Sequence, residues 1–172
     1  GTDLGFEARR IEDILTRGIR VSSSLVRAAI TKGALRCARL ALGRTYFVDG
    51  RVITGQRLGR KLGFPTINLA PDNDLVPGGG VYVTSCRFAS VPGLFESVTN
   101  VGVRPTLFES SEVTIESHVL DFDANVYEDE VRVYFHALLR REKRFASIDE
   151  LTGQIRRDIE QTREFFRRRP TF

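Results

Sequence analysis

Five segments between residues 44 and 139 constrain the fold of this chain more than any other feature. Each is rich in Val, Ile, Phe, Tyr and Thr, and Gly, Pro, Asp or Asn residues separate it from the next. The segments are YFVDGRVITG, GVYVTSCRF, GLFESVTNVGV, EVTIESHVLDF and DEVRVYFHALL. Several short strands with this punctuation are typical of an antiparallel barrel or sandwich. The sequence therefore predicts a mainly β body over residues 44–172.

Alternation of side chains is clearest in residues 113–119, where successive residues of a strand point to opposite faces. One face would carry Val113, Ile115, Ser117 and Val119, and the other Thr114, Glu116 and His118. A glutamate in the middle of a strand usually faces solvent. Alternatively, Glu116 faces a cleft and accepts a proton from a substrate hydroxyl. The pattern leaves both possibilities open, as it does for metal or nucleotide contacts at the nearby Asp121 and Asp123.

Helical segments are predicted on both sides of the β body. Residues 1–43 read as a short strand followed by helices, with Ser22–Ser24 as N-caps, a break near Gly33 and a stop at Gly43. A segment of this length is too short for a core of its own, so it must pack on the next domain or on another one.

The C-terminal segment, residues 147–169, is predicted as a helix that begins at the capping box of Ser147 and Glu150. Apolar side chains and one threonine recur near the helical period at Ile148, Leu151, Ile155, Ile159, Thr162 and Phe166. The residues between them are mostly charged, which indicates a surface helix with one face covered.

Composition excludes several classes of protein. The 41% hydrophobic and 28% charged residues are typical of a folded globular chain, and no apolar run approaches the roughly 20 residues of a membrane helix. The net charge of +4 lies in residues 1–43, which leaves the β body neutral and argues against nucleic acid as its partner. Cys37 and Cys86 form no CxxC pair and no metal-ligand spacing with His118 or His136, so we expect both to be ordinary buried residues in a reducing cytoplasm.

The segment GQRLGRKLGFPTINL, residues 55–69, is the most unusual part of the sequence. Its glycines would allow backbone N–H groups to approach an anion, and its cations would add positive charge. These features suit a phosphate chain, although the segment matches neither a P-loop nor a dinucleotide-binding fingerprint. A plain surface turn is the alternative interpretation.

The Thr66-x-Asn68 pair in this segment points toward a metal ion. In an extended segment both side chains lie on the same side, and their oxygen atoms are ligands that suit Mg²⁺. Because both ligands are neutral, the ion would need the charge of nucleotide phosphates. The alternative is that both side chains bond to their own backbone.

Together these motifs resemble the riboflavin kinase family. GRKLGFPTIN, GVYV, NVGVRPT, ESHVLDFDANVY and LLRREKRF occur in the order and spacing of that family over about residues 44–168. The resemblance implies a small six-stranded antiparallel Greek-key barrel with a C-terminal helix. It also implies transfer of the γ-phosphate of ATP to the terminal ribityl hydroxyl of riboflavin, with Mg²⁺, or else Mn²⁺ or Zn²⁺, as the metal.

The resemblance also assigns residue roles. Glu116 would be the catalytic base, and Thr66 and Asn68 would bind the metal and the nucleotide phosphates. The other residues bordering ATP would be Gly55, Arg60, Val119, Asp121 and Tyr127. The residues bordering the flavin would be Arg140, Lys143 and Phe145, with the loop around residues 100–106 closing nearby. One departure is Glu128 after Tyr127, where the family often has glycine.

Residues 1–43 are similar to the end of the FMN adenylyltransferase module of bifunctional bacterial FAD synthetases. On this expectation the chain begins inside a truncated module, the parent protein also makes FAD, and this chain alone does not. Two other functions remain as alternatives. One is a small β-barrel that binds single-stranded nucleic acid, and the other is a non-catalytic flavin- or nucleotide-binding regulator on the same fold.

Overall fold

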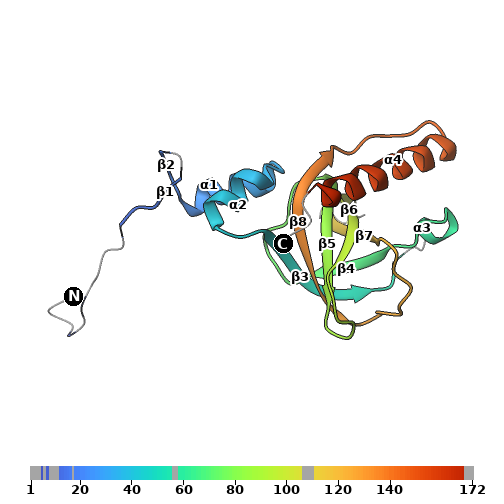
Figure 1. Ribbon diagram of the computed structural model, residues 1–172, viewed down its shortest axis with the longest axis horizontal. Coiled ribbons are helices and arrows are strands. Elements are labelled where there is room, and N and C mark those ends of the chain that lie inside the picture. Colours follow the sequence, from blue (N-terminus) through green and yellow to red (C-terminus); the bar gives the residue numbers. More distant parts are fainter. Residues whose placement is uncertain are drawn as a thin grey trace.

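A six-stranded antiparallel barrel forms the centre of the computed structural model, and helices pack on its outside (Figure 1). The structure describes residues 5, 7, 12–16, 18–55, 58–105 and 111–168, without the side chains of residues 103–105 and 111–112. The barrel strands are β3 (Tyr46–Ile53), β4 (Ile67–Pro71), β5 (Gly80–Phe88), β6 (Phe95–Pro105), β7 (Ser111–Val119) and β8 (Glu130–Arg140).

The strand order around the closed barrel is β3-β4-β7-β6-β5-β8, with every neighbouring pair antiparallel. Since β4 and β7 are neighbours but not consecutive, the connection is of the Greek-key kind. This confirms the predicted fold class. Five strands match the five β-rich segments. The sixth strand, β4, was not predicted, because it is short and ends at a proline.

The barrel interior is apolar at its centre and carries a row of hydroxyl groups. Alternate residues of each strand point inward, so that Val48, Val52, Ile115, Val133 and Phe135 are almost fully buried together. Thr84, Ser97, Thr99 and Ser117 are equally buried and bond to one another across β5, β6 and β7 at 2.6–2.7 Å. Each hydroxyl thus has a partner, which removes the cost of burying it.

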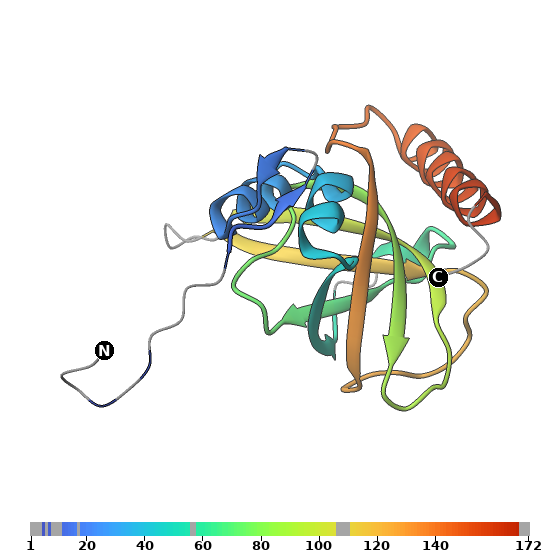
Figure 2. The ribbon, with the colours of Figure 1, turned by 60° about the vertical axis from the view of Figure 1, so that its left-hand side comes forward.

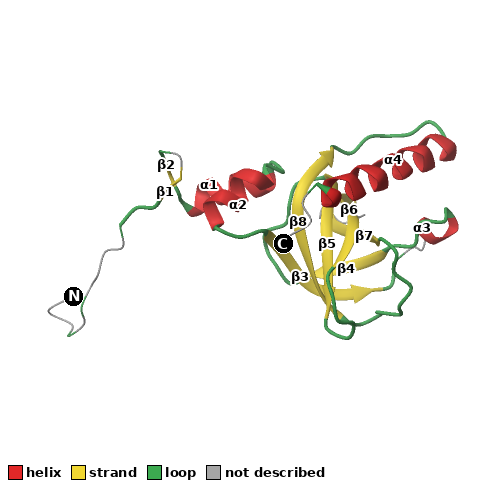
Figure 3. Ribbon diagram, viewed as in Figure 1, coloured by secondary structure: helices red, strands yellow, loops and turns green. Residues whose placement is uncertain are grey.

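The remaining elements are β1 (Leu15–Thr16), β2 (Ile19–Arg20), α1 (Ser23–Thr31), α2 (Leu35–Leu42), α3 (Leu58–Lys61) and α4 (Ile148–Arg167). Figure 3 separates these helices from the strands of the barrel. The predicted caps are confirmed: Ser22 caps α1, and Gly43 ends α2 in the left-handed conformation with φ +70°. The short helix α3 lies in the segment that the sequence suggested as a glycine-rich loop.

The helices α1 and α2 pack against one end of the barrel, as the view in Figure 2 shows. Ile30, Leu35 and Ala38 belong to the same buried cluster as the barrel residues Tyr46 and Val48. The turn between the helices is equally close, because a Cβ on Gly33 would lie 3.1 Å from the side chain of Leu138. The segment before residue 44 therefore packs on the following domain, one of the two possibilities that its length left open.

The C-terminal helix α4 lies across the outer face of β5 and β6 (Figures 1 and 2). Ser147 accepts a hydrogen bond from the Glu150 amide, while the Glu150 carboxylate accepts one from Ala146, so the predicted cap holds. Ile148, which the pattern placed on the covered face, is instead 65% exposed at the start of the helix. Asp158, further along the helix, is buried, although the sequence pattern placed it among the surface charges.

No helix in the described part of the chain is both long and apolar enough to span a bilayer.

Candidate functional site

Two neighbouring cavities lie on one side of the barrel, and Thr66 lines both. The first, which we name the loop-side cavity, has a volume of about 500 Å³ and is bordered by the 122–127 segment after β7. The second, the helix-side cavity, has a volume of about 380 Å³ and lies between α3, the strands and α4. Each is large enough to hold part of a small organic ligand.

The helix-side cavity combines an apolar wall with a few polar groups. The apolar wall consists of Leu62, Phe64, Val81, Val98, Ile155 and Ile159. Phe145 also lines this cavity, and its polar side chains are Thr66, Asn100, Glu116, His118, Arg140, Glu142, Lys143 and Asp158. An apolar slot with converging polar groups suits a planar aromatic ligand that carries a polar tail.

Glu116 reaches this cavity because β7 alternates as the sequence indicated. Ile115 and Ser117 are 1% exposed inside the barrel, while Glu116 and His118 point to the outer face and are half-buried. Of the two possibilities that the pattern left open for Glu116, solvent or a cleft, the structure shows the cleft. The cleft is on the outer face of the barrel, beneath α4, rather than within it.

Asn68 lies directly opposite Glu116 in the β4–β7 ladder, and Asn100 lies opposite it on the other side in β6. The three side chains therefore form one row across three strands on the outer face. Asn68 itself lines neither cavity. Its amide packs against Gly55, where a Cβ would come within 2.2–2.5 Å of the amide atoms, so only glycine permits this approach.

Thr66 offers a neutral hydroxyl oxygen in the cavity that Glu116 lines, and Asn68 offers an amide oxygen from the position opposite Glu116 in the ladder. Such hard oxygen ligands fit a divalent cation that also binds phosphate oxygens. Gly59 keeps the turn before Thr66 tight, because a Cβ there would lie 2.4 Å from the Phe64 carbonyl oxygen and 3.3 Å from the Thr66 hydroxyl. The residues present therefore fit the metal that the sequence suggested.

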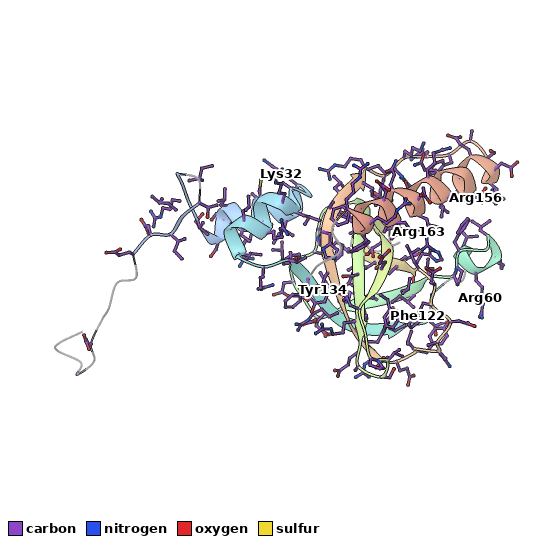
Figure 4. All side chains as sticks on the ribbon, viewed as in Figure 1. Lys32, Arg60, Phe122, Tyr134, Arg156 and Arg163 are labelled. Carbon is purple, nitrogen blue, oxygen red and sulfur yellow. The ribbon has the colours of Figure 1, made fainter. Side chains whose placement is uncertain are left out.

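The loop-side cavity contains four of the residues expected beside ATP: Arg60, Thr66, Val119 and Tyr127. Figure 4 labels Arg60 on α3 and Phe122 on the segment after β7, both of which line it. Glu128 has φ +65°, a left-handed conformation that glycine adopts more readily than other residues. The residue after Tyr127 therefore has a backbone conformation that would suit glycine, although it is a glutamate.

Asp121 does not line this cavity. Its carboxylate accepts two hydrogen bonds from Arg163 of α4, and these bonds hold the pKa of Asp121 below its usual value. Its φ of +52° is also left-handed, which places it at a sharp turn between β7 and the cavity segment. The predicted ATP contact of Asp121 remains a prediction, whereas its contact with α4 was not expected.

The three residues expected beside the flavin all line the helix-side cavity. Arg140 donates from Nε and Nη2 to Asp158 at 3.0 and 2.9 Å, and Gln154 donates to the other Asp158 oxygen at 2.8 Å. Lys143 lies over the Phe145 ring, 4.7 Å from its centroid. Asp158 thus fixes the end of β8 against α4 with a largely buried ion pair.

Of the loop expected around residues 100–106, residues 100–105 belong to β6, so this part is strand rather than loop, and Thr106 lies outside the described residues. The sequence assigned no role to His118, Asp158 or Arg163, and it placed Asn100 only in the loop expected near the flavin. A signal existed for Asp158, since it stands four residues before Thr162 and three after Ile155, on the covered stripe of α4.

Comparisons with known proteins agree with this geometry. The family model of riboflavin kinase, or flavokinase, matches residues 42–166. The bifunctional riboflavin kinase/FMN adenylyltransferase of Pseudomonas fluorescens is 38% identical over 165 residues, covering 95% of this chain and 52% of that protein. The Escherichia coli K12 protein of the same description is 37% identical over 170 residues, with 96% and 52% covered. The chain therefore spans about half the length of these relatives.

Two solved structures share the fold. A Streptococcus pneumoniae protein described as a macrolide-efflux protein superposes with a TM-score of 0.82 at 30% identity, covering 89% of this chain and 50% of that one. Riboflavin kinase from Trypanosoma brucei superposes with a TM-score of 0.54 at 25% identity, covering 72% of this chain and 78% of its own. With the family model matching most of its length, the chain belongs to the riboflavin kinase family.

Proposed function

We propose that this chain transfers the γ-phosphoryl group of ATP to the terminal ribityl hydroxyl of riboflavin, giving FMN and ADP. The observation that carries the proposal is the position of Thr66, which lines both cavities, next to Glu116 in the helix-side cavity. A ligand in each cavity would therefore meet its neighbour at the Thr66–Glu116 boundary. Phosphoryl transfer requires this arrangement, since it depends mainly on positioning and charge neutralisation.

Riboflavin would occupy the helix-side cavity. Its tricyclic ring would lie on the apolar wall between α3 and α4, with Phe145 beside it and Arg140 and Lys143 along the polar edge. The ribityl chain would then point toward Glu116 and Asn100. ATP would occupy the loop-side cavity, with Arg60 near its phosphates and Val119 and Tyr127 near the base or ribose.

Glu116 would act as the general base. Its carboxylate would accept the proton of the ribityl hydroxyl as that oxygen forms a bond to the γ-phosphorus, while the bond from the γ-phosphorus to the bridging oxygen of ADP breaks. Thr66 and Asn68 would hold a divalent cation such as Mg²⁺. When bound, this ion would neutralise charge on the phosphates.

The relatives named above combine this activity with FMN adenylyltransferase. Both cavities are formed by residues 58–159, which lie within the region matched by the kinase model. We therefore assign only the kinase step to these cavities. Cys86 is buried, as expected, but the expectation is wrong for Cys37, which lies on the exposed face of α2 beside the buried Ala38. Both are free thiols, which suits the cytoplasm as the compartment where the protein works.

The direct test is incubation of the protein with riboflavin, ATP and Mg²⁺, followed by chromatographic separation of the flavins. We expect FMN to form in proportion to protein concentration, and no FMN when the nucleotide or the metal is omitted. Binding of riboflavin or nucleotide without any FMN would refute the proposed activity and favour a regulator built on this fold.

A further inference from the structure

His118 makes a hydrogen bond that joins two parts of the proposed active site. Its Nδ1 lies 2.7 Å from the carbonyl oxygen of Pro65. Because a carbonyl oxygen only accepts hydrogen bonds, the proton of the pair is on Nδ1. The ring also meets the Phe64 ring edge to face, with a centroid distance of 6.0 Å and an interplanar angle of 90°. Both contacts fall on the segment immediately before Thr66.

The β4–β7 ladder explains why a side chain is needed here. The ladder pairs Leu69 with Ile115, Asn68 with Glu116 and Ile67 with Ser117, and it stops there. Pro65 has no amide hydrogen and cannot donate to a further backbone bond. The imidazole of His118 instead bonds to the Pro65 carbonyl oxygen, just past the end of the backbone ladder.

The consequence concerns the relative placement of two functional groups. His118 stands two residues after Glu116 on the same face of β7, and its bond partner stands one residue before Thr66. A loss of this bond would free the 64–66 segment from β7, while Ile67 and Asn68 would still be held by the ladder. The side chain most affected would be that of Thr66, which is common to both cavities.

We propose that His118 is a positioning residue that holds Thr66 in place for the metal-bound nucleotide. The inference rests on the proposed kinase function and adds a residue to it. His118 would take no proton from the substrate. Its Nδ1–H bond would set the position of the Thr66 hydroxyl, and hence the affinity for Mg²⁺-ADP and Mg²⁺-ATP.

Two substitutions separate the hydrogen bond from the ring. His118→Asn keeps a donor near the position of Nδ1 but removes the ring, whereas His118→Phe keeps a ring against Phe64 but removes the donor. A single hydrogen bond of this kind corresponds to a change of about 3- to 10-fold. We therefore expect His118→Phe to weaken Mg²⁺-ADP binding, measured by calorimetry, by about that factor. It should raise the KM for ATP more than the KM for riboflavin.

His118→Asn should recover most of the lost affinity. Equal Mg²⁺-ADP affinity for His118→Phe and the unchanged protein would overturn the proposal, as would a His118→Asn protein that binds as weakly as His118→Phe. If the unchanged protein neither binds Mg²⁺-ADP nor makes FMN, the proposed function fails instead.

A spectroscopic readout tests the bond without any ligand. The chain has two histidines, so the imidazole nitrogen signals are few, and those of His118 are the ones that vanish in His118→Asn. We expect neutral His118 to be in the Nδ1–H tautomer, because the Pro65 carbonyl oxygen accepts a hydrogen bond from Nδ1. Finding His118 in the Nε2–H tautomer would refute the inference even if the kinase activity is present.

Discussion

Arg163 of α4 forms a bidentate ion pair with Asp121, with Nη1–Oδ2 and Nη2–Oδ1 distances of 2.7 and 2.9 Å. The helix that covers the helix-side cavity is thereby tied to the turn that leads into the loop-side cavity (Figure 4 labels Arg163). Asp121 is an exposed residue, so the pair adds little to global stability. Its effect is local, on the position of the 122–127 segment.

The first prediction follows from this pair. Arg163→Gln should raise the KM for ATP several-fold, with a smaller change in the KM for riboflavin and almost no change in melting temperature. Steady-state kinetics and a thermal melt would measure these effects. Arg156→Gln, an exposed arginine on the same helix, is the matched control and should behave as the parent protein does. A similar rise in both KM values would contradict the local role of the pair.

The same pair has a pH dependence of known sign. Arg163 holds the folded-state pKa of Asp121 below its value in the unfolded chain. The stabilisation that the ionised Asp121 carboxylate provides through this ion pair is therefore complete above the unfolded-state pKa. It is lost as the pH falls through the folded-state pKa. We expect the KM for ATP to rise in acid in the parent protein. In Arg163→Gln, the KM for ATP should rise less as the pH falls, because protonation of Asp121 no longer breaks an ion pair.

The second prediction concerns Glu116. Its replacement by glutamine keeps the shape but removes the base, so kcat should fall by about 10²- to 10⁴-fold while Mg²⁺-ADP binding stays largely intact. Glu130→Gln is the control, because Glu130 is an exposed strand carboxylate that lines neither of the two cavities. FMN formation at the parental rate by Glu116→Gln would show that another group takes the proton.

The third prediction tests the contact between Gly55 and Asn68. A Cβ at residue 55 would come within 2.5 Å of the amide, so Gly55→Ala must displace the Asn68 side chain. Gly55→Ala and Asn68→Ala should each weaken Mg²⁺-ADP binding. Both substitutions act on the same amide. The loss of Mg²⁺-ADP binding free energy in the double variant, measured by calorimetry, should therefore be much smaller than the sum of the losses in the two single variants. Strict additivity would mean that Gly55 acts independently of Asn68.

The fourth prediction concerns Glu128, which has φ +65°. The left-handed conformation costs a side chain about 1–2 kcal/mol, whereas glycine adopts it freely but loses about 0.5–1 kcal/mol through its flexible unfolded state. Glu128→Gly should therefore stabilise the protein slightly in urea denaturation. Glu130→Gly, in regular strand, should destabilise it. Equal destabilisation by both changes would argue against a left-handed turn at residue 128.

The fifth prediction concerns the thiols. Cys86 is buried in the barrel, and its burial raises the pKa to about 11, whereas Cys37 is exposed on α2. A thiol reagent at neutral pH should modify one cysteine in the folded protein and both in denaturant, because the thiolate is the reactive form. Cys37→Ser should remove the fast reaction. Rapid modification of Cys86 in that variant would contradict the closed barrel core.

Part of the fold and of the candidate site could be predicted from the sequence because motif spacing and strand alternation are local properties. The alternation of Ile115, Glu116 and Ser117 between two faces follows from a period of two, although the pattern did not say which face borders a cleft. The caps at Ser22 and Ser147 follow from local hydrogen bonding. These features need no knowledge of distant parts of the chain.

The missed features depend on contacts between segments far apart in sequence. Arg163 and Asp121 are 42 residues apart, and His118 and Pro65 are 53 apart, so no local pattern links them. The helical pattern alone placed Asp158 among the solvent-exposed charges, because its partner Arg140 lies on a different element, β8. The strand β4 was missed because five residues that end in proline give too short an alternation.

The shared core of α1, α2 and the barrel has a consequence for where the protein can be divided. The family match begins at residue 42, but Ile30, Leu35 and Ala38 already contribute apolar surface to the barrel core. Cutting the gene at that match would expose the barrel end around Tyr46 and Leu138 to water. We therefore expect a protein that starts at Ser22, the N-cap of α1, to be more stable than one that starts at residue 42, where the family match begins.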